Sequence, residues 1–189
     1  DFCLSRGLGD VYKRQAQLRA AAGRVVDIGS GAGFPGLPLA IAILDAEVVL
    51  LEASGRKCEF IERAIRRCGL SNTSVVQGRA ESWPEGAERF DVATVRALGS
   101  LDVVLEYSAP LLRLGGHLIA WRGRRDHSAE AKAAAAADEL GMELRAVRAV
   151  RPFPRAAHRH LHLATKVRAT PERFPRRPGV AVKRPLGGR

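Results

Sequence analysis

Residues 25–36 read VVDIGSGAGFPG, an apolar run with one acid followed by four glycines within eight residues. An apolar segment with helical spacing comes next, so the stretch predicts a buried strand, a glycine turn and a helix. Glycine lets the backbone take positive φ and approach a ligand closely, and the first N–H groups of the following helix are free. The stretch therefore predicts a turn that binds a nucleotide-like cofactor.

Two kinds of cofactor fit this turn. Its last three glycines match the G-x-G-x-x-G fingerprint of dinucleotide-binding folds, and Glu52 follows near the position of a ribose-binding acid. Asp27, two residues before the first glycine, and the Phe34-Pro35 step differ from that fingerprint. With these details the turn resembles the S-adenosylmethionine loop of class I methyltransferases. The resemblance implies that Asp27 helps to fix the loop and that Glu52 holds the ribose hydroxyls.

The composition is typical of one soluble domain. The chain has 189 residues, 46% of them hydrophobic and 27% charged, and no apolar stretch approaches the length of a membrane helix. No signal peptide is visible. Cys3, Cys58 and Cys68 are too few and too irregularly spaced for a disulfide framework or a zinc site, which favours the reducing cytoplasm. We expect a cytoplasmic monomer with no membrane partner.

The net charge of +11 is concentrated at the C-terminal end. Residues 145–189 carry 13 Lys or Arg and a single acid, whereas residues 16–144 carry 15 basic and 17 acidic residues. A one-sided basic segment is typical of proteins with a polyphosphate partner, because each cation that meets a phosphate releases counterions. Charge alone leaves both a nucleic-acid partner and a solvated basic tail open. An anionic membrane fits less well, since no amphipathic helix accompanies the charge.

Three parts are predicted along the chain. Residues 1–15 show no periodicity and resemble the translated sequencing-adapter string found at the ends of metagenomic gene models, which predicts a non-native segment. Residues 16–169 form the predicted cofactor-binding domain. Residues 170–189 contain four prolines and are expected to form a basic arm without regular structure.

Strands and helices alternate along the predicted domain. Apolar runs predict strands at residues 25–29, 48–52, 74–77, 90–95 and 118–121, and period-two alternation predicts two more at 142–150 and 161–167. Helices are predicted at 37–44, 57–68, 101–114 (closed by Gly115 and Gly116) and around the alanine run 133–137. This order predicts an α/β fold with a doubly wound, mostly parallel seven-stranded sheet and helices on both faces.

Ligands of an open parallel sheet bind beyond the carboxyl ends of its strands. This rule selects four segments as candidate binding loops: residues 29–34, 52–53, 78–81 and 94–98. Arg96 stands out, because a charged residue there ends an otherwise apolar strand at the expected cleft. The alternative for Arg96 is a simple surface cation.

Five segments, taken in order, resemble one family, the RsmG (GidB) type of small-subunit ribosomal RNA guanine-N7 methyltransferases. They read VVDIGSGAGFPGLPLAI, LLEASGRKCEFIERA, VVQGRAE, FDVATVRALGSLDVVLEYSAPLLRLGGHLIAWRG and RFPRRPGVAVKRPL, and the resemblance spans residues 24–186. It implies a Rossmann-like class I methyltransferase fold. It also implies transfer of a methyl group from S-adenosylmethionine to N7 of a loop guanine in 16S ribosomal RNA.

The resemblance places the site residues as well. Cofactor contacts fall by motif on Gly29, Phe34, Ala80, Glu81 and Arg96. Further cofactor candidates come from the loop and from the end of the second strand: Asp27, Gly31, Gly33 and Glu52. The RNA-binding candidates are cations of the basic segment: Arg155, Arg159, Lys166, Arg173, Arg176, Arg177, Lys183 and Arg184.

Guanine N7 presents a lone pair and carries no proton, so its methylation requires no general base. The enzyme has to hold the two reactants in line and exclude water. Class I enzymes that methylate exocyclic amines carry an Asn/Asp-Pro-Pro-aromatic signature after the fourth strand, where this chain reads Val95-Arg96-Ala97-Leu98. Arg96 is therefore predicted to act catalytically, by organising the cofactor end of the site or by donating to guanine. The target guanine is expected in a loop, since N7 of paired A-form RNA lies in a deep, narrow groove.

Two other functions remain open from the sequence. A nicotinamide-dependent oxidoreductase would use the same glycines, although Tyr12 and Tyr107 look poorly placed for its proton relay. A catalytically impaired basic RNA-binding domain is the second, because family members ordinarily have further helices before the glycine-loop strand. His158, His160 and His162 are expected on one strand face, but no carboxylate or Cys stands near them in sequence, so no metal site is predicted.

Overall fold

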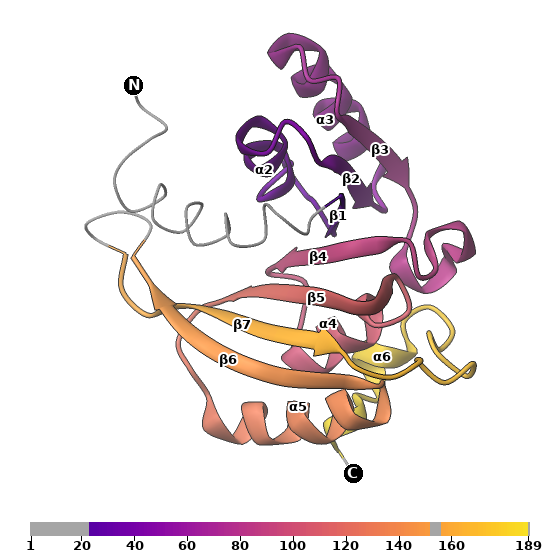
Figure 1. Ribbon diagram of the computed structural model, residues 1–189, viewed down its shortest axis with the longest axis vertical. Helices are drawn as coiled ribbons and strands as arrows, with labels where there is room; N and C mark the ends of the chain where they lie inside the picture. Colours follow the sequence, from indigo (N-terminus) through magenta and orange to yellow (C-terminus); the bar gives the residue numbers. More distant parts are fainter. Residues whose placement is uncertain (1–22, 152–155, 189) are drawn as a thin grey trace.

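The computed structural model describes residues 23–151 and 156–188, and the structural statements below concern these residues. The strands are β1 (Arg24–Ile28), β2 (Glu47–Glu52), β3 (Thr73–Gln77), β4 (Phe90–Arg96), β5 (Leu112–Arg122), β6 (Met142–Val150) and β7 (Arg159–Lys166). They form one seven-stranded sheet in the order β3-β2-β1-β4-β5-β7-β6 (Figure 1). β7 runs antiparallel to β5 and β6 on either side of it, and the other four strand pairs are parallel. The predicted doubly wound, mostly parallel sheet is confirmed.

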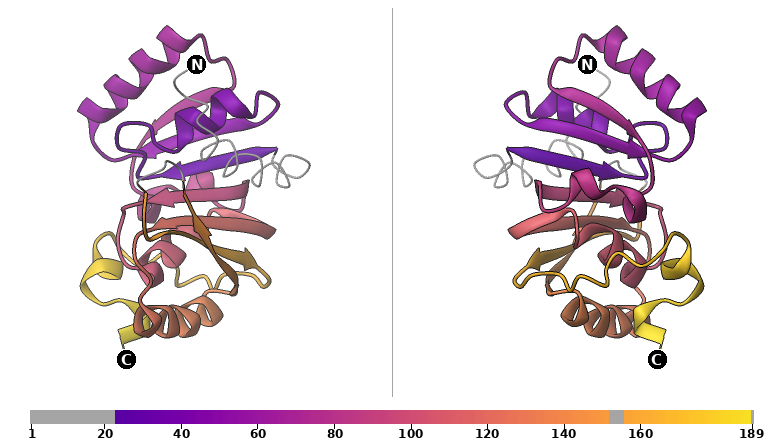
Figure 2. Two further views of the ribbon diagram at one scale, coloured as in Figure 1. Left: turned by 90° about the vertical axis from the view of Figure 1, so that its left-hand side faces the viewer. Right: turned by 90° about the vertical axis from the view of Figure 1, so that its right-hand side faces the viewer.

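Helices cover both faces of this sheet (Figure 2). The α-helices are α2 (Gly36–Ala42), α3 (Gly55–Cys68), α4 (Leu101–Ser108), α5 (His127–Glu139) and α6 (Val180–Lys183). Short 3₁₀ turns occur at η1 (Ala80–Ser82), η2 (Pro84–Gly86) and η3 (Leu186–Gly188). Apolar residues of α2 and α3 pack on one face, and those of α4, α5 and the C-terminal arm pack on the other.

The two packed faces follow from the alternation of side chains along each strand. On β4, Val92 belongs to the apolar cluster under α2, whereas Ala93 and Val95 belong to the cluster under α4 and α5. All eight residues of α4 are buried. This helix is therefore covered on its outer side too, by α5 and by the chain that follows β7.

The predicted helix at residues 101–114 is wrong at its end. α4 ends at Ser108, and β5 begins at Leu112. Gly115 and Gly116 lie inside β5, next to a register shift between β4 and β5, and a Cβ on Gly116 would come within 3.0 Å of the Phe90 carbonyl oxygen. The glycines allow this irregular, close pairing of strands. The sequence could not show it, because a short apolar run fits a helix and a strand equally well.

The C-terminal arm, residues 170–188, is more regular than predicted, since it contains α6 and η3. Phe174, Ala181 and Leu186 are buried in the apolar cluster that also holds α4 and α5. These three side chains explain the order of the arm, because burying apolar surface offsets the entropy cost of fixing the chain. A proline count does not reveal such packing.

The remaining predicted elements occur close to their expected positions. The alanine run lies within the longer α5, whose N-cap residue Asp126 accepts a hydrogen bond from the Ala129 N–H at 3.1 Å. In the described part of the chain, no helix has both the length and the apolar character needed to span a membrane. The predictions for residues 1–15 and for Arg155 lie outside the described residues.

Candidate active site

A cavity of about 450 Å³ lies at the carboxyl ends of β1, β2, β3 and β4, where the strand-end rule placed the site. Seven of the nine predicted cofactor residues line it: Gly29, Gly31, Phe34, Glu52, Ala80, Glu81 and Arg96. The other two, Asp27 and Gly33, do not line the cavity. The four segments selected from the sequence thus converge on one hollow.

The turn after β1 requires its glycines. Gly29, Gly31 and Gly33 have φ values of 69°, 60° and 86°, a region that residues with a Cβ rarely adopt. A Cβ on Gly29 would lie 2.7 Å from a Leu98 methyl carbon. A Cβ on Gly33 would meet Leu37 at 2.4 Å, on the side of α2 rather than of the cavity. Gly33 therefore shapes the turn and is not a direct lining residue.

Asp27 supports the turn from behind. Its carboxylate is buried, and Oδ2 accepts a hydrogen bond from the Gly36 N–H at 2.9 Å. Burial raises the pKa of Asp27 to about 7, and the hydrogen bonds from Gly36 and Ser30 oppose this rise. Asp27 does not line the cavity, and its carboxylate ties β1 to the start of α2, in line with its expected part in fixing the loop. A direct contact of Asp27 with the cofactor stays a prediction.

Glu52 holds the glycine turn and faces the cavity as well. Its side chain is buried at the end of β2, where Oε2 accepts from the Gly31 N–H and Oε1 from the Ser54 N–H, both at 2.9 Å. Lys57 Nζ lies 4.0 Å from Oε1. A carboxylate has roughly four acceptor positions, so Glu52 retains capacity for the hydroxyls of a ligand.

Arg96 and Phe34 stand together at the cavity. The guanidinium carbon of Arg96 lies 5.7 Å from the centroid of the Phe34 ring, within the range of a cation–π contact. Both side chains are exposed, Phe34 by 49%. A large aromatic ring left open beside a cavity offers a flat face to a planar ligand.

Five lining residues lie outside the four segments that the sequence selected: Ile28, Leu51, Lys57, Tyr107 and Val182. Tyr107 looked poorly placed, but α4 brings it to the cavity wall. Burial, together with the nearby Glu81 carboxylate, raises the pKa of Tyr107 to about 12, so the phenol stays neutral. Arg79 lies inside a segment that the strand-end rule had selected. No sequence signal marked Val182, which reaches the cavity from the C-terminal arm.

Lys166, one of the predicted RNA-binding residues, is buried in the structure. Its side chain is fully buried, and Nζ donates to the Leu112 carbonyl oxygen at 2.8 Å and to Glu88 Oε1 at 2.9 Å. A buried ammonium group needs such partners, because it has lost its hydration. Lys166 therefore joins the end of β7 to the start of β5 and cannot reach a phosphate.

Replacing Lys166 by Met is expected to lower the free energy of unfolding by about 1–3 kcal/mol, because the Leu112 carbonyl oxygen loses its charged donor. The affinity for ribosomal RNA should stay unchanged in the folded variant. Urea unfolding measures the first quantity and filter binding at fixed salt measures the second. A large loss of RNA affinity without loss of stability would restore the RNA-binding interpretation.

Arg176, another predicted RNA-binding residue, is paired with a buried acid. It donates from Nε to Glu106 Oε1 at 2.8 Å and from Nη2 to Glu106 Oε2 at 2.5 Å, and only 19% of its side chain is exposed. These hydrogen bonds raise the pKa of the Arg176 guanidinium. Arg173 is exposed but pairs with Glu139 at 3.3 Å. Within the described residues, four predicted cations are exposed and have no acid at ion-pair distance: Arg159, Arg177, Lys183 and Arg184.

Two of the three histidines share one strand face as expected, since His160 and His162 are two residues apart in β7, but the third does not. His158 precedes β7 and has a φ of 54°. His160 Nδ1 lies 2.8 Å from the Gly123 carbonyl oxygen, and His162 Nε2 lies 3.1 Å from Glu130 Oε1. In residues 23–151 and 156–188, no three His, Cys, Asp or Glu side chains gather as a metal site requires.

Comparison with known proteins decides the family. The family model described as "GidB: rRNA small subunit methyltransferase G" matches residues 4–161. The chain belongs to this family. Ribosomal RNA small subunit methyltransferase G of Rubrobacter xylanophilus is 43% identical over 174 residues, which are 89% of this chain and 67% of the relative. The protein of the same name from Carboxydothermus hydrogenoformans is 43% identical over 179 residues, 93% of this chain and 74% of the relative.

The fold of this GidB-family chain also matches solved methyltransferases. A SAM-dependent methyltransferase from Aquifex aeolicus superposes with a TM-score of 0.65 at 16% identity, covering 84% of this chain and 90% of that one. At this identity the match concerns the fold alone. The predicted family and the class I methyltransferase fold are both confirmed, and the oxidoreductase alternative is wrong.

Proposed function

We propose that this GidB-family chain transfers a methyl group from S-adenosylmethionine to N7 of a loop guanine in small-subunit ribosomal RNA. We further propose that it works as a monomer in the cytoplasm. The observation that carries the proposal is the convergence of Glu52, the glycine turn and Arg96 on one cavity at the strand ends. Beside this cavity the Arg96 guanidinium and the Phe34 ring are exposed and available to the substrate.

The cavity suits S-adenosylmethionine in size and chemistry. Its volume of about 450 Å³ lies in the usual range of roughly 300–1,000 Å³ for small-molecule sites. Glu52 would accept hydrogen bonds from the ribose hydroxyls, and Gly29 and Gly31 leave room for the ligand to approach the backbone. Ala80 and Glu81 line another wall. The bound cofactor supplies a methyl group on a positively charged sulfur.

The chain's own residues then have a positioning task. The N7 lone pair forms the new bond while the methyl–sulfur bond breaks, and no proton has to leave guanine. The carboxylates of the cavity fit this view, since Glu52 already accepts two backbone N–H groups and Glu81 one. Neither needs to act as a base.

Arg96 is assigned the orientation of the guanine. Its guanidinium can donate to O6, the acceptor next to N7. A cation beside a purine that gains positive charge does not stabilise that charge, so orientation is the role that remains. Phe34 would provide a stacking face for the base. The exposed cations Arg159, Arg177, Lys183 and Arg184 would bind neighbouring phosphates.

One experiment tests the proposal. The chain is incubated with methyl-labelled S-adenosylmethionine and either small ribosomal subunits or their naked RNA, and the product is mapped by N7-specific strand scission. Label at N7 of a loop guanine is expected. Label on another base or atom, or binding of NAD but not S-adenosylhomocysteine in calorimetry, would overturn it. Comparing the two substrates shows whether assembled subunits or free RNA is methylated.

A further inference from the structure

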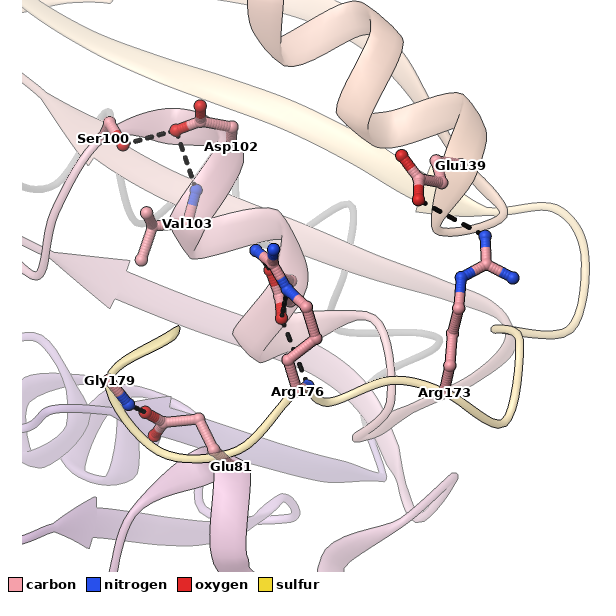
Figure 3. Close-up of polar contacts among 9 residues, drawn as sticks. Glu81, Ser100, Asp102, Val103, Glu139, Arg173, Arg176 and Gly179 are labelled. Carbon is pink, nitrogen blue, oxygen red and sulfur yellow. Dashed lines mark hydrogen bonds and ion pairs between the residues drawn. The ribbon is translucent and has the colours of Figure 1, made fainter. Parts of the chain in front are cut away.

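Besides its three buried apolar side chains, the C-terminal arm (residues 170–188) is tied to α4 by a buried ion pair. Glu106 of α4 is 1% exposed, and both its oxygens are bound by Arg176 (Figure 3). The backbone N–H of Arg176 donates to Glu106 Oε1 as well, at 3.2 Å. Figure 3 shows Arg176 on the part of the arm that passes α4. Both the side chain and the backbone N–H of Arg176 thus bind the Glu106 carboxylate.

Buried Glu106 has lost contact with water, and Arg176 supplies the donors that replace its hydration. A carboxylate that is removed from water is costly unless charged, bidentate donors replace its hydration. The neighbouring pair of Arg173 and Glu139 is different, since both side chains are partly exposed and 3.3 Å apart. Exposed pairs contribute little to holding a segment. Of the two ion pairs, that of Arg176 and not that of Arg173 is therefore the polar anchor of the arm.

Beyond this anchor the arm reaches the cofactor cavity. The Gly179 N–H donates to Glu81 Oε1 at 3.2 Å, and Glu81 is a lining residue (Figure 3). Val182, in the short helix that follows Gly179, lines the cavity itself although its own surface is 59% exposed. Val182 follows Ala181, which is 1% exposed in the apolar cluster with α4 and α5. The packing of Ala181, the Arg176–Glu106 pair and the Gly179–Glu81 contact together hold Val182 at the cavity.

We infer that residues 170–188 form one wall of the cofactor site and that Arg176 and Glu106 are positioning residues for cofactor binding. The inference rests on the proposed function, because it takes the cavity as the S-adenosylmethionine site. The bound cofactor stabilises the docked arm to the same extent as the docked arm strengthens cofactor binding, since coupling between two equilibria is reciprocal.

The first test is calorimetric titration with S-adenosylhomocysteine of the unmodified chain and of the Arg176→Ala and Arg173→Ala variants. Arg176→Ala is expected to weaken binding about tenfold or more, within the usual range of coupling. Arg173→Ala, the matched control three residues earlier on the same arm, should change it less than about twofold. Arg176→Lys keeps the charge but loses the bidentate contact, so its affinity should lie between them.

The second test needs no variant. Hydrogen exchange of the Gly179, Lys183 and Arg184 amides, which donate to Glu81 and within the α6 turn, is followed with and without S-adenosylhomocysteine. Exchange is expected to slow at least about fivefold in the complex. If Arg176→Ala fails to fold, the hydrogen-exchange result alone decides whether the arm is coupled to cofactor binding.

The outcomes separate the two ideas. An unmodified chain that binds no S-adenosylhomocysteine would overturn the proposed function and, with it, this inference. Tight binding that is equal in all folded variants, or that leaves the three amides unchanged, overturns the inference alone. A loss of thermal stability in Arg176→Ala at full ligand affinity would show that the pair only supports the fold.

Discussion

Replacing Arg96 by Ala is expected to lower the rate of methyl transfer to ribosomal RNA by about 100-fold or more, the usual cost of misplacing a reactant. The variant should still fold. Arg96 ends β4 with an exposed side chain and contacts the exposed Phe34 ring, so its removal leaves no cavity and no stranded acid. Initial rates with methyl-labelled cofactor and thermal unfolding measure the two effects.

The kinetic constants distinguish the two roles considered for Arg96. If Arg96 orients guanine, kcat/KM for RNA falls while the affinity for S-adenosylhomocysteine stays the same. If it organises the cofactor, that affinity falls too. Arg66→Ala is the control, because Arg66 is an exposed arginine on α3 outside the cavity. Full activity of Arg96→Ala would contradict both roles.

Replacing Glu52 by Ala is expected to weaken binding of S-adenosylhomocysteine by about 100-fold. The Gly31 and Ser54 N–H groups lose their acceptor, and leaving such groups unpaired costs about 1–3 kcal/mol each. The predicted partner of the ribose hydroxyls disappears at the same time. Glu52→Gln keeps one carbonyl acceptor but turns an N–H₂ group toward a donor, so an intermediate affinity is expected.

Calorimetry on folded variants measures this effect, with Glu59→Ala as the control. Glu59 belongs to the same chain segment, is exposed and does not line the cavity. Unchanged affinity in Glu52→Ala would show that the cofactor does not use the end of β2. If Glu52→Ala only disrupts the glycine turn, the backbone NMR signals of the turn change without ligand. Comparing the affinities of Glu52→Ala and Glu52→Gln then separates the loss of the turn from the loss of the ligand contact.

Much of the site could be predicted because it consists of loops at the ends of parallel strands. Alternating strands and helices imply that these loops share one edge of the sheet, so the sequence predicts that Gly29, Glu52, Glu81 and Arg96 lie close together there. The structure confirms that they line one cavity. Asp27 and Gly33 do not line the cavity, because Asp27 lies in β1 with its carboxylate toward the Gly36 N–H and Gly33 packs toward Leu37.

The basic segment shows where prediction from sequence stopped. In the sequence, nothing distinguishes Lys166 and Arg176 from the other cations of the segment. In the structure, Lys166 pairs with an acid 78 residues away and Arg176 with one 70 residues away. Counting charges in the sequence gives the net charge of a segment but not which of its cations form ion pairs. Whether a cation is free for phosphate depends on which acids the fold brings to it, and this information is not local.

The sequence by itself determined the sheet, the glycine turn and the loops that form the cavity, because hydrophobic periodicity and the φ preference of glycine act over a few residues. Only the tertiary structure decided that β5 begins at Leu112, that Tyr107 and Val182 line the cavity, and that Arg176 ties the C-terminal arm to α4. These outcomes rest on contacts between segments distant in the chain. Burial and ion pairing there depend on the whole packed molecule.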